Sequence, residues 1–217
     1  MLARSQLWIV ASQLVACASS GVRPDDMSAE AHRQEAAYER QTASDRERQA
    51  VEQTQGPRPD FDPYRHPQMG LDPASRLLWE AESRRAHALQ HEAAAHSLER
   101  FEAQECAGID SSLRAACPVL GPVKAIRDIP GGVRLELADG SHLDGLLALM
   151  RCHLAYAQSK GFEPVAAACP LYIRGIQIRA STDGAALEIV GATERLASEI
   201  RSRSLETAIR TSKADAR

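Results

Sequence analysis

The chain has 217 residues, with 26 Lys and Arg against 29 Asp and Glu, for a formal net charge of −3. The near balance of charge, with no basic patch interleaved with aromatic residues, argues against a nucleic-acid-binding protein. Aromatic residues make up only 4% of the chain, and the apolar fraction depends heavily on alanine. Because alanine buries little area, the sequence does not predict one large, dense core over its whole length.

The first 17 residues resemble the signal sequence of a bacterial lipoprotein. A short basic start (1–4) precedes an apolar run (7–16, LWIVASQLVA) that is too short to span a bilayer. The run ends in Leu14-Val15-Ala16-Cys17, which resembles a lipobox, where the cysteine is acylated and becomes the new N-terminus. We expect a signal peptide at 1–16 and lipidation at Cys17. Cleavage by the ordinary signal peptidase, or the start of a buried apolar helix, are the alternatives.

This N-terminal sequence also predicts where in the cell the protein is located. Cutting before Cys17 leaves 201 residues with a net charge of −4, and no other segment is apolar for long enough to cross a membrane. Ala18, in place of an aspartate after the cysteine, favours the outer membrane by analogy with known sorting. We therefore expect a cell-envelope protein that is held by its lipid anchor, faces the periplasm and has an envelope protein as its possible partner.

The next part of the chain (27–109) is predicted to be helical, after a flexible tether at 17–26. The first helix, from Met27 to about Gln55 with Ser28 as its N-cap, has only a thin apolar stripe. A proline-rich linker (56–72) follows, and Asp72-Pro73 restarts a helix that meets no proline or glycine before Gly108. Its expected anchors are the large apolar residues Leu77, Leu78, Trp79, Leu89, Leu98 and Phe101. The pattern predicts a helical hairpin or stalk, with a partly disordered first helix as the alternative.

The last hundred residues (110–210) predict a small ββαββα domain of the α+β class, with an antiparallel sheet and a C-terminal tail at 211–217. The expected elements are strands at 123–129 and 133–137, a helix capped by Ser141 with Asp144, strands at 173–180 and 185–190, and a helix capped by Thr193. The segment Gly132–Leu137 (GVRLEL) is echoed by Gly184–Ile189 (GAALEI), which hints at pseudo-twofold repetition.

Four cysteines remain when Cys17 is set aside, and export makes disulfides their default fate. Spacing favours the neighbours, Cys106 with Cys117 and Cys152 with Cys169, among the three possible connectivities. Cys152 is expected opposite the apolar stripe of its helix, so it is not simply a small core residue. A metal or redox role for Cys152, His153 and Cys169 is the alternative.

Histidines on the second long helix are weak candidates for metal ligands. His87 and His91 stand four residues apart and share a helical face, but zinc and copper sites require three or four ligands. His96 and Glu92 project elsewhere, and His32 is available only if the first helix packs antiparallel to the second. A solvated, histidine-rich face is the simpler interpretation, so we expect no high-affinity metal site and no cofactor.

Short motifs along the chain resemble a family of uncharacterised proteobacterial lipoproteins. They are Asp25-Asp26-Met27-Ser28 with His32, then Glu105-Cys106-Ala107-Gly108-Ile109, Cys152-His153-Leu154-Ala155 and Cys169-Pro170-Leu171. The resemblance implies an architecture and a localisation in the cell envelope, but no activity. Members of the family lack a cysteine at the position of Cys117, which weakens the case for a Cys106–Cys117 bridge.

Local signatures of enzymes do not occur: the sequence contains no G-x-S-x-G, H-E-x-x-H or C-x-x-C motif and no phosphate-binding glycine loop. The leading hypothesis is a membrane-anchored, non-catalytic binding or scaffolding module. One alternative is a periplasmic metal-binding or metal-stress protein that uses the histidines of the long helix. The other is an enzyme whose active site is assembled from distant positions.

Overall fold

A computed structural model of the protein describes residues 21–55, 72–120, 123–163 and 169–215. The expected signal peptide (1–16), Cys17, most of the tether and linker residues 56–71 lie outside these ranges. Among the helices that are described, none combines the length and apolar character needed to cross a membrane.

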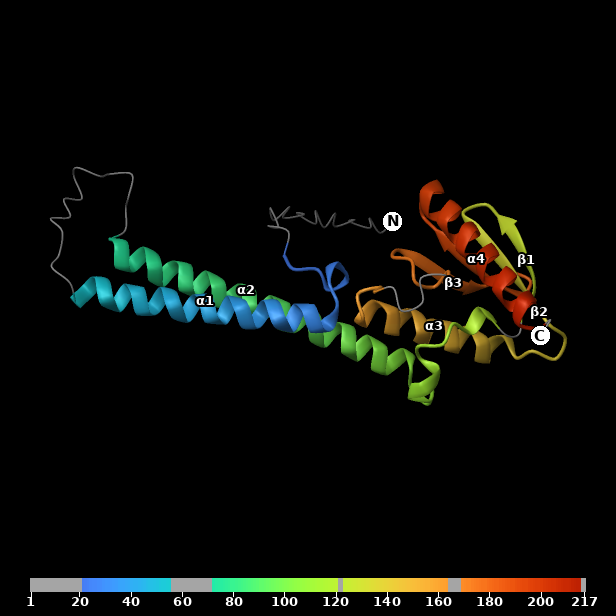
Figure 1. The fold of residues 1–217 in the computed structure, drawn as a ribbon, viewed down its shortest axis with the longest axis horizontal. Coiled ribbons are helices and arrows are strands. Elements are labelled where there is room, and N and C mark those ends of the chain that lie inside the picture. The colour runs from blue at the N-terminus through green and yellow to red at the C-terminus, as the bar shows by residue number, and fades with distance from the viewer. Residues whose placement is uncertain (1–20, 56–71, 121–122, 164–168, 216–217) are drawn as a thin grey trace, which may run out of the picture.

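The observed elements confirm the α+β class, with two long helices before a small sheet domain (Figure 1). In chain order they are η1 (Pro24–Asp26), α1 (Ala29–Gln55), α2 (Pro73–Glu105), η2 (Ser111–Leu113), η3 (Pro118–Leu120), β1 (Val123–Ile129), β2 (Gly132–Leu137), α3 (Leu143–Ser159), β3 (Ile176–Ala180), β4 (Ala186–Gly191) and α4 (Glu194–Asp215), where η marks a 3-10 turn. Residues 211–215, expected as a tail, continue the last helix.

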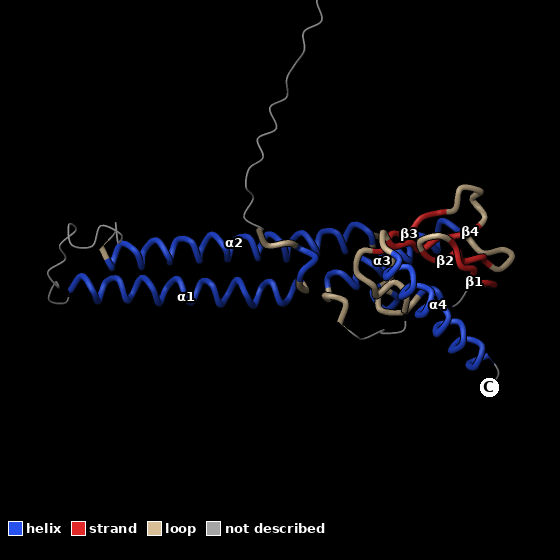
Figure 2. Tube along the Cα trace, turned by 90° about the horizontal axis from the view of Figure 1, so that it is seen from above, coloured by secondary structure: helices blue, strands red, loops and turns tan. Residues whose placement is uncertain are grey.

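Helices α1 and α2 lie antiparallel over most of their length and form the predicted hairpin (Figure 2). The predicted caps are in place. The Ser28 Oγ accepts a hydrogen bond from the Ala31 backbone N–H at 3.0 Å, and the Asp72 carboxylate accepts from the backbone N–H groups of Ala74 and Ser75. The hairpin projects away from the sheet domain, with its free end formed by the end of α1 and the start of α2 (Figure 1).

Alanine at every seventh position forms the interface of the hairpin. The buried alanines that follow this spacing are Ala29, Ala36, Ala43 and Ala50 on α1, and Ala74, Ala81, Ala88 and Ala95 on α2, where Ala94 is buried as well. A seven-residue repeat keeps one stripe of each helix facing the other, and the small methyl groups allow the two backbones to approach closely. The stripe is only a weak signal in the sequence because alanine has low hydrophobicity, although its spacing is regular.

Ion pairs between the helices follow the same seven-residue spacing. Arg33 pairs with Glu99, Arg40 with Glu92 and Glu47 with Arg85. Each step of seven residues up α1 therefore matches a step of seven residues down α2. Such pairs contribute little stability one by one, but they favour the antiparallel direction and one register of the hairpin.

The sheet domain is a four-stranded antiparallel sheet, in the order β1-β2-β4-β3, with α3 and α4 packed on one face. Its core joins apolar side chains of the two central strands to those of the helices: Val133, Leu135, Leu187, Ile189, Leu146, Met150 and Ile200. Gly132 is required because a Cβ atom there would lie 2.0 Å from the Ile189 carbonyl oxygen.

The sheet supports the internal repeat that the sequence hints at. Leu135 and Leu187 occupy equivalent places in the two echoed segments, and the antiparallel register places them directly opposite one another. This register is the one expected if an approximate twofold axis between the two leucines related the β2 segment to the β4 segment.

Two details of the helices differ from prediction. The N-cap residue of α3 is His142, and not Ser141, and the His142 side chain makes no capping hydrogen bond. On α2, Leu77 and Leu98 are buried, whereas Leu78, Trp79, Leu89 and Phe101 are exposed. These four are not anchors, because the alanine stripe, and not the largest side chains, sets which face of α2 meets α1.

Candidate functional site

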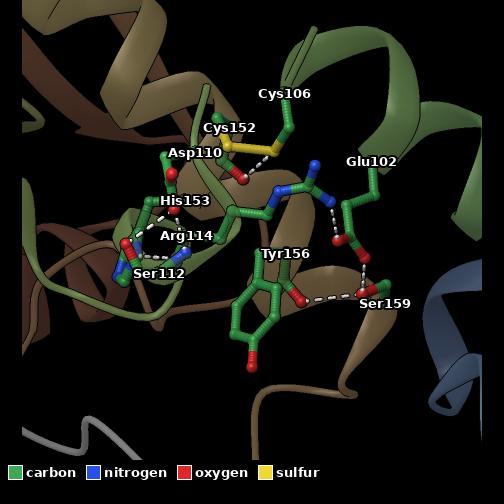
Figure 3. Close-up of polar contacts among 9 residues, drawn as sticks. All are labelled: Glu102, Cys106, Asp110, Ser112, Arg114, Cys152, His153, Tyr156 and Ser159. Atoms are coloured by element: carbon green, nitrogen blue, oxygen red, sulfur yellow. Dashed lines mark hydrogen bonds and ion pairs between the residues drawn. A yellow bond between two sulfur atoms is a disulfide. The ribbon is translucent and has the colours of Figure 1, made fainter. Parts of the chain in front are cut away.

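The hairpin and the sheet domain meet at a disulfide between the end of α2 and the middle of α3 (Figure 3). Cys106 is the C-cap residue of α2 and bonds to Cys152 of α3, with a Cα–Cα distance of 4.5 Å. Both cysteines are almost completely buried. The bridge therefore joins the hairpin to the sheet domain by a covalent bond.

The second bridge joins Cys117 to Cys169, so the predicted pairing of neighbours was wrong although all four cysteines are in disulfides. The prediction rested on loop length, which favours close partners. The structure instead packs the end of α2 against the face of α3 opposite its apolar stripe. The expected off-stripe position of Cys152 was the signal that a second layer covers that face.

His153 lies beside the second bridge and is fully buried. Its Nδ1 atom is 2.7 Å from the Arg114 carbonyl oxygen, so Nδ1 carries the proton and donates. This leaves the lone pair of Nε2 directed at the Cys169 sulfur, 3.5 Å away. Burial lowers the pKa of His153, and the hydrogen bond to Arg114 opposes this shift only in part.

A polar network links the same elements around these bridges. The Glu102 carboxylate on α2 pairs with the Arg114 guanidinium at 3.0 Å and accepts a hydrogen bond from the Ser159 hydroxyl of α3 at 2.5 Å (Figure 3). Asp110 accepts from the Ser112 backbone N–H and holds the intervening turn. A pocket of about 290 Å³ opens beside Glu102, between the first turn of α1, α2 and the end of α3.

A second cluster of titratable groups lies inside the hairpin, where two histidines replace the apolar layer. His32 of α1 and His91 of α2 are both buried, and their Nδ1 atoms are 2.9 Å apart. The His32 Nε2 atom is 3.2 Å from the Pro24 carbonyl oxygen, to which it donates its proton. His32 Nδ1 therefore accepts a hydrogen bond from the Nδ1–H of His91 when both rings are neutral.

A buried carboxylate forms the next polar layer of the hairpin. Glu39 is 3% exposed, and its oxygens accept hydrogen bonds from Arg84 at 3.0 Å and contact the His87 Nδ1 at 2.9 Å. Burial acts to raise the pKa of Glu39, but the hydrogen bonds from His87 and Arg84 outweigh it and hold that pKa below its ordinary value. The His87 ring also contacts His91, with 4.7 Å between ring centroids.

The antiparallel packing thus brings His32 to the predicted pair of His87 and His91, an arrangement that the sequence made conditional on such packing. Glu92 and His96 project away from this cluster, as predicted. Glu92 pairs with Arg40, and the exposed ring of His96 lies near Glu99. Glu39 was not predicted as a member of this cluster. Its position seven residues after His32, in step with the seven-residue repeat, is the signal that could have identified it.

Comparisons with known proteins add nothing to these observations, since no family model, no curated protein and no solved structure matches the chain.

Proposed function

We propose that this chain is a lipid-anchored protein of the cell envelope that uses its helical hairpin as a rigid arm to bind a partner protein. The anchor is Cys17, proposed from its position at the end of the apolar run in the sequence. The Cys106–Cys152 bridge and the interhelical ion pairs support a rigid arm, because they hold the hairpin to the domain and fix its register.

The inverted distribution of apolar side chains on the hairpin carries this proposal. Alanines fill the interface, whereas Trp79 is 64% exposed, Leu89 65% and Tyr38 61%. Leu78 and Trp79 lie in the second turn of α2, close to the free end of the arm (Figure 1). A tryptophan held in solvent gains nothing for the fold, but aromatic residues are frequent at the energetic centres of protein interfaces.

Site-specific photocrosslinking tests the arm in its native envelope. A crosslinking residue at Leu78 should give one discrete adduct, which Trp79→Ser in the same chain should weaken strongly. The same residue at Asp128, an exposed position on β1 of the sheet domain, serves as the control and should give none. Equal adducts from both positions, or no effect of Trp79→Ser, would contradict the proposal.

The anchor is tested separately by intact mass and membrane fractionation. Mature protein should begin at Cys17 with added acyl mass, and Cys17→Ala should lose that mass and the membrane association. A mature chain that begins at another residue, or that carries no acyl group, would overturn the anchor but leave the binding arm open to its own test.

The histidine cluster supports a second candidate function, binding of a divalent metal ion in the hairpin. Two Nδ1 atoms 2.9 Å apart can both ligate one ion after a small separation, with His87 and Glu39 beside them. Calorimetric titration of oxidised protein with zinc and copper(II) tests this function. Submicromolar affinity that is lost in His32→Ala and kept in the exposed control His96→Ala would establish it, whereas weaker binding would leave the cluster as a structural layer.

A further inference from the structure

We infer that Cys117, His153 and Cys169 form a zinc-type metal site when the bridge between the two cysteines is reduced. The two sulfurs and a nitrogen of His153 lie within 4.8 Å of one another. Zinc binds thiolates at about 2.3 Å and imidazole at about 2.1 Å, so ligand atoms of one tetrahedral ion lie roughly 3.4–3.8 Å apart. The three groups therefore need only small shifts, apart from the opening of the S–S bond.

The orientation of His153 is that of a metal ligand. In metal sites the second ring nitrogen of a histidine usually donates to a carbonyl or carboxylate, which fixes the tautomer and directs the other lone pair at the ion. Here Nδ1 donates to the Arg114 carbonyl at 2.7 Å, and Nε2 faces the Cys169 sulfur. The ring is also held in place by Tyr172, with 5.1 Å between ring centroids.

The site is largely shielded from water, and one of its ligands is accessible from solvent. His153 and Cys169 are almost completely buried, whereas Cys117 is half-buried, so an ion and one solvent ligand can reach the site from the side of Cys117. Two thiolates and one neutral imidazole suit zinc, and a solvent molecule can take the fourth position.

Opening the Cys117–Cys169 bridge requires a reductant, and a dithiol can supply the electrons. Two electrons and two protons pass from the dithiol to the Cys117–Cys169 bridge, so the dithiol becomes a disulfide and both cysteines become thiols. Binding of Zn²⁺ then displaces the two thiol protons into solvent. The step does not require the Cys106–Cys152 bridge to open. Both of its cysteines are almost completely buried, whereas Cys117 is half-buried, so a dithiol reaches the Cys117–Cys169 bridge more easily.

Cobalt(II) provides the direct test, since thiolate ligands give it intense near-ultraviolet charge-transfer absorption. The full chain carrying Cys17→Ser is reduced with a dithiol until two thiols per chain are free, then freed of reductant and titrated anaerobically. We expect one equivalent of cobalt with thiolate charge transfer, displaced by one equivalent of zinc, and no such band in the oxidised protein. A reduced protein that shows no charge-transfer band at one equivalent would overturn the inference.

Variants separate this site from the other bridge and from the hairpin histidines. The paired variant Cys106→Ser with Cys152→Ser should keep the band, as should His91→Gln. Cys117→Ser, at the half-buried position, should lose most of it, and His153→Gln should weaken binding more than tenfold. Far-ultraviolet circular dichroism shows whether each variant is folded. A band that persists at full strength in folded Cys117→Ser would refute the assignment even if His153→Gln does not fold.

Discussion

The Nδ1 atoms of His32 and His91 lie 2.9 Å apart in the interior of the hairpin, so a single proton joins the two rings. The arrangement works only while at least one ring is neutral, because two protonated imidazoles would place donor against donor and charge against charge. The polar layer thus makes the stability of an otherwise alanine-packed hairpin depend on pH.

We expect the hairpin to lose stability as the pH falls from about 7.5 to about 5.5. Burial lowers the pKa of His91 from its ordinary value of 6.5, and the charges of His87 and His32 lower it further against the opposing carboxylates Glu35 and Glu39. The unfolded chain therefore takes up a proton near pH 6.5 that the folded chain resists, which favours unfolding below that pH.

Thermal unfolding followed by circular dichroism measures this effect. His91→Gln should flatten the dependence of Tm on pH, although His153, whose pKa burial also lowers, should leave a residual slope. His96→Gln is the control, because that ring is 70% exposed. An equal slope in wild type and His91→Gln would show that the buried pair does not govern the pH response.

Substitution in the alanine stripe tests the close approach of the two helices. Ala36 is fully buried in the interface, and Ala37 beside it is exposed. Ala36→Leu should destabilise the protein by about 1–3 kcal/mol, because overpacking forces the helices apart. Ala37→Leu adds the same atoms at the adjacent, exposed position and should change the free energy of unfolding by less than about 0.5 kcal/mol. Urea unfolding of both variants decides between overpacking and a general effect of leucine.

The carboxylate of Glu39 has a structural role that its neutral analogue cannot fill. Glu39→Gln keeps the shape but removes the charge that holds Arg84 and His87, and we expect a loss of about 1.5–3 kcal/mol in urea unfolding. Glu80→Gln provides the comparison, because Glu80 pairs with Arg46 at the surface, with its side chain 37% exposed, and should cost less than about 1 kcal/mol. Similar losses for both variants would show that burial of Glu39 does not matter.

The disulfide at the junction should stabilise the fold through the 46-residue separation that it closes. The chain-entropy model gives about 4 kcal/mol for a loop of this size, lost in the paired variant Cys106→Ala with Cys152→Ala. Non-reducing peptide mapping should recover Cys106 with Cys152 and Cys117 with Cys169. Recovery of Cys106 with Cys117 from native protein would contradict the structure.

Local patterns predicted most of the fold, because caps, turns and hydrophobic periodicity act over a few residues. The caps at Ser28, Asp72 and Thr193 were predicted correctly, and so were all four strands to within three residues. The exposed Trp79 was not predicted, because size alone made it appear an anchor, whereas the alanine repeat decides which face of α2 is buried.

The candidate sites were harder to predict because each depends on which elements lie side by side. The His87 and His91 pair was visible at helical spacing, but its third member His32 required the antiparallel register of two helices. For the cysteines, loop length pointed to neighbours, while packing of α2 on α3 brought together residues 46 positions apart. The separation of two cysteines along the chain does not show which helices pack against one another.

The order of the two bridges along the chain also bears on how the protein is oxidised. Their loops interleave, since Cys117 lies between Cys106 and Cys152, while Cys152 lies between Cys117 and Cys169. If an oxidant joins Cys106 to Cys117, the nearest neighbours in the sequence, that linkage must be broken by thiol–disulfide exchange before either native bridge forms. Interleaved bridges therefore make exchange between bridges, and not only oxidation, a step on the way to the native pairing whenever neighbouring cysteines join first.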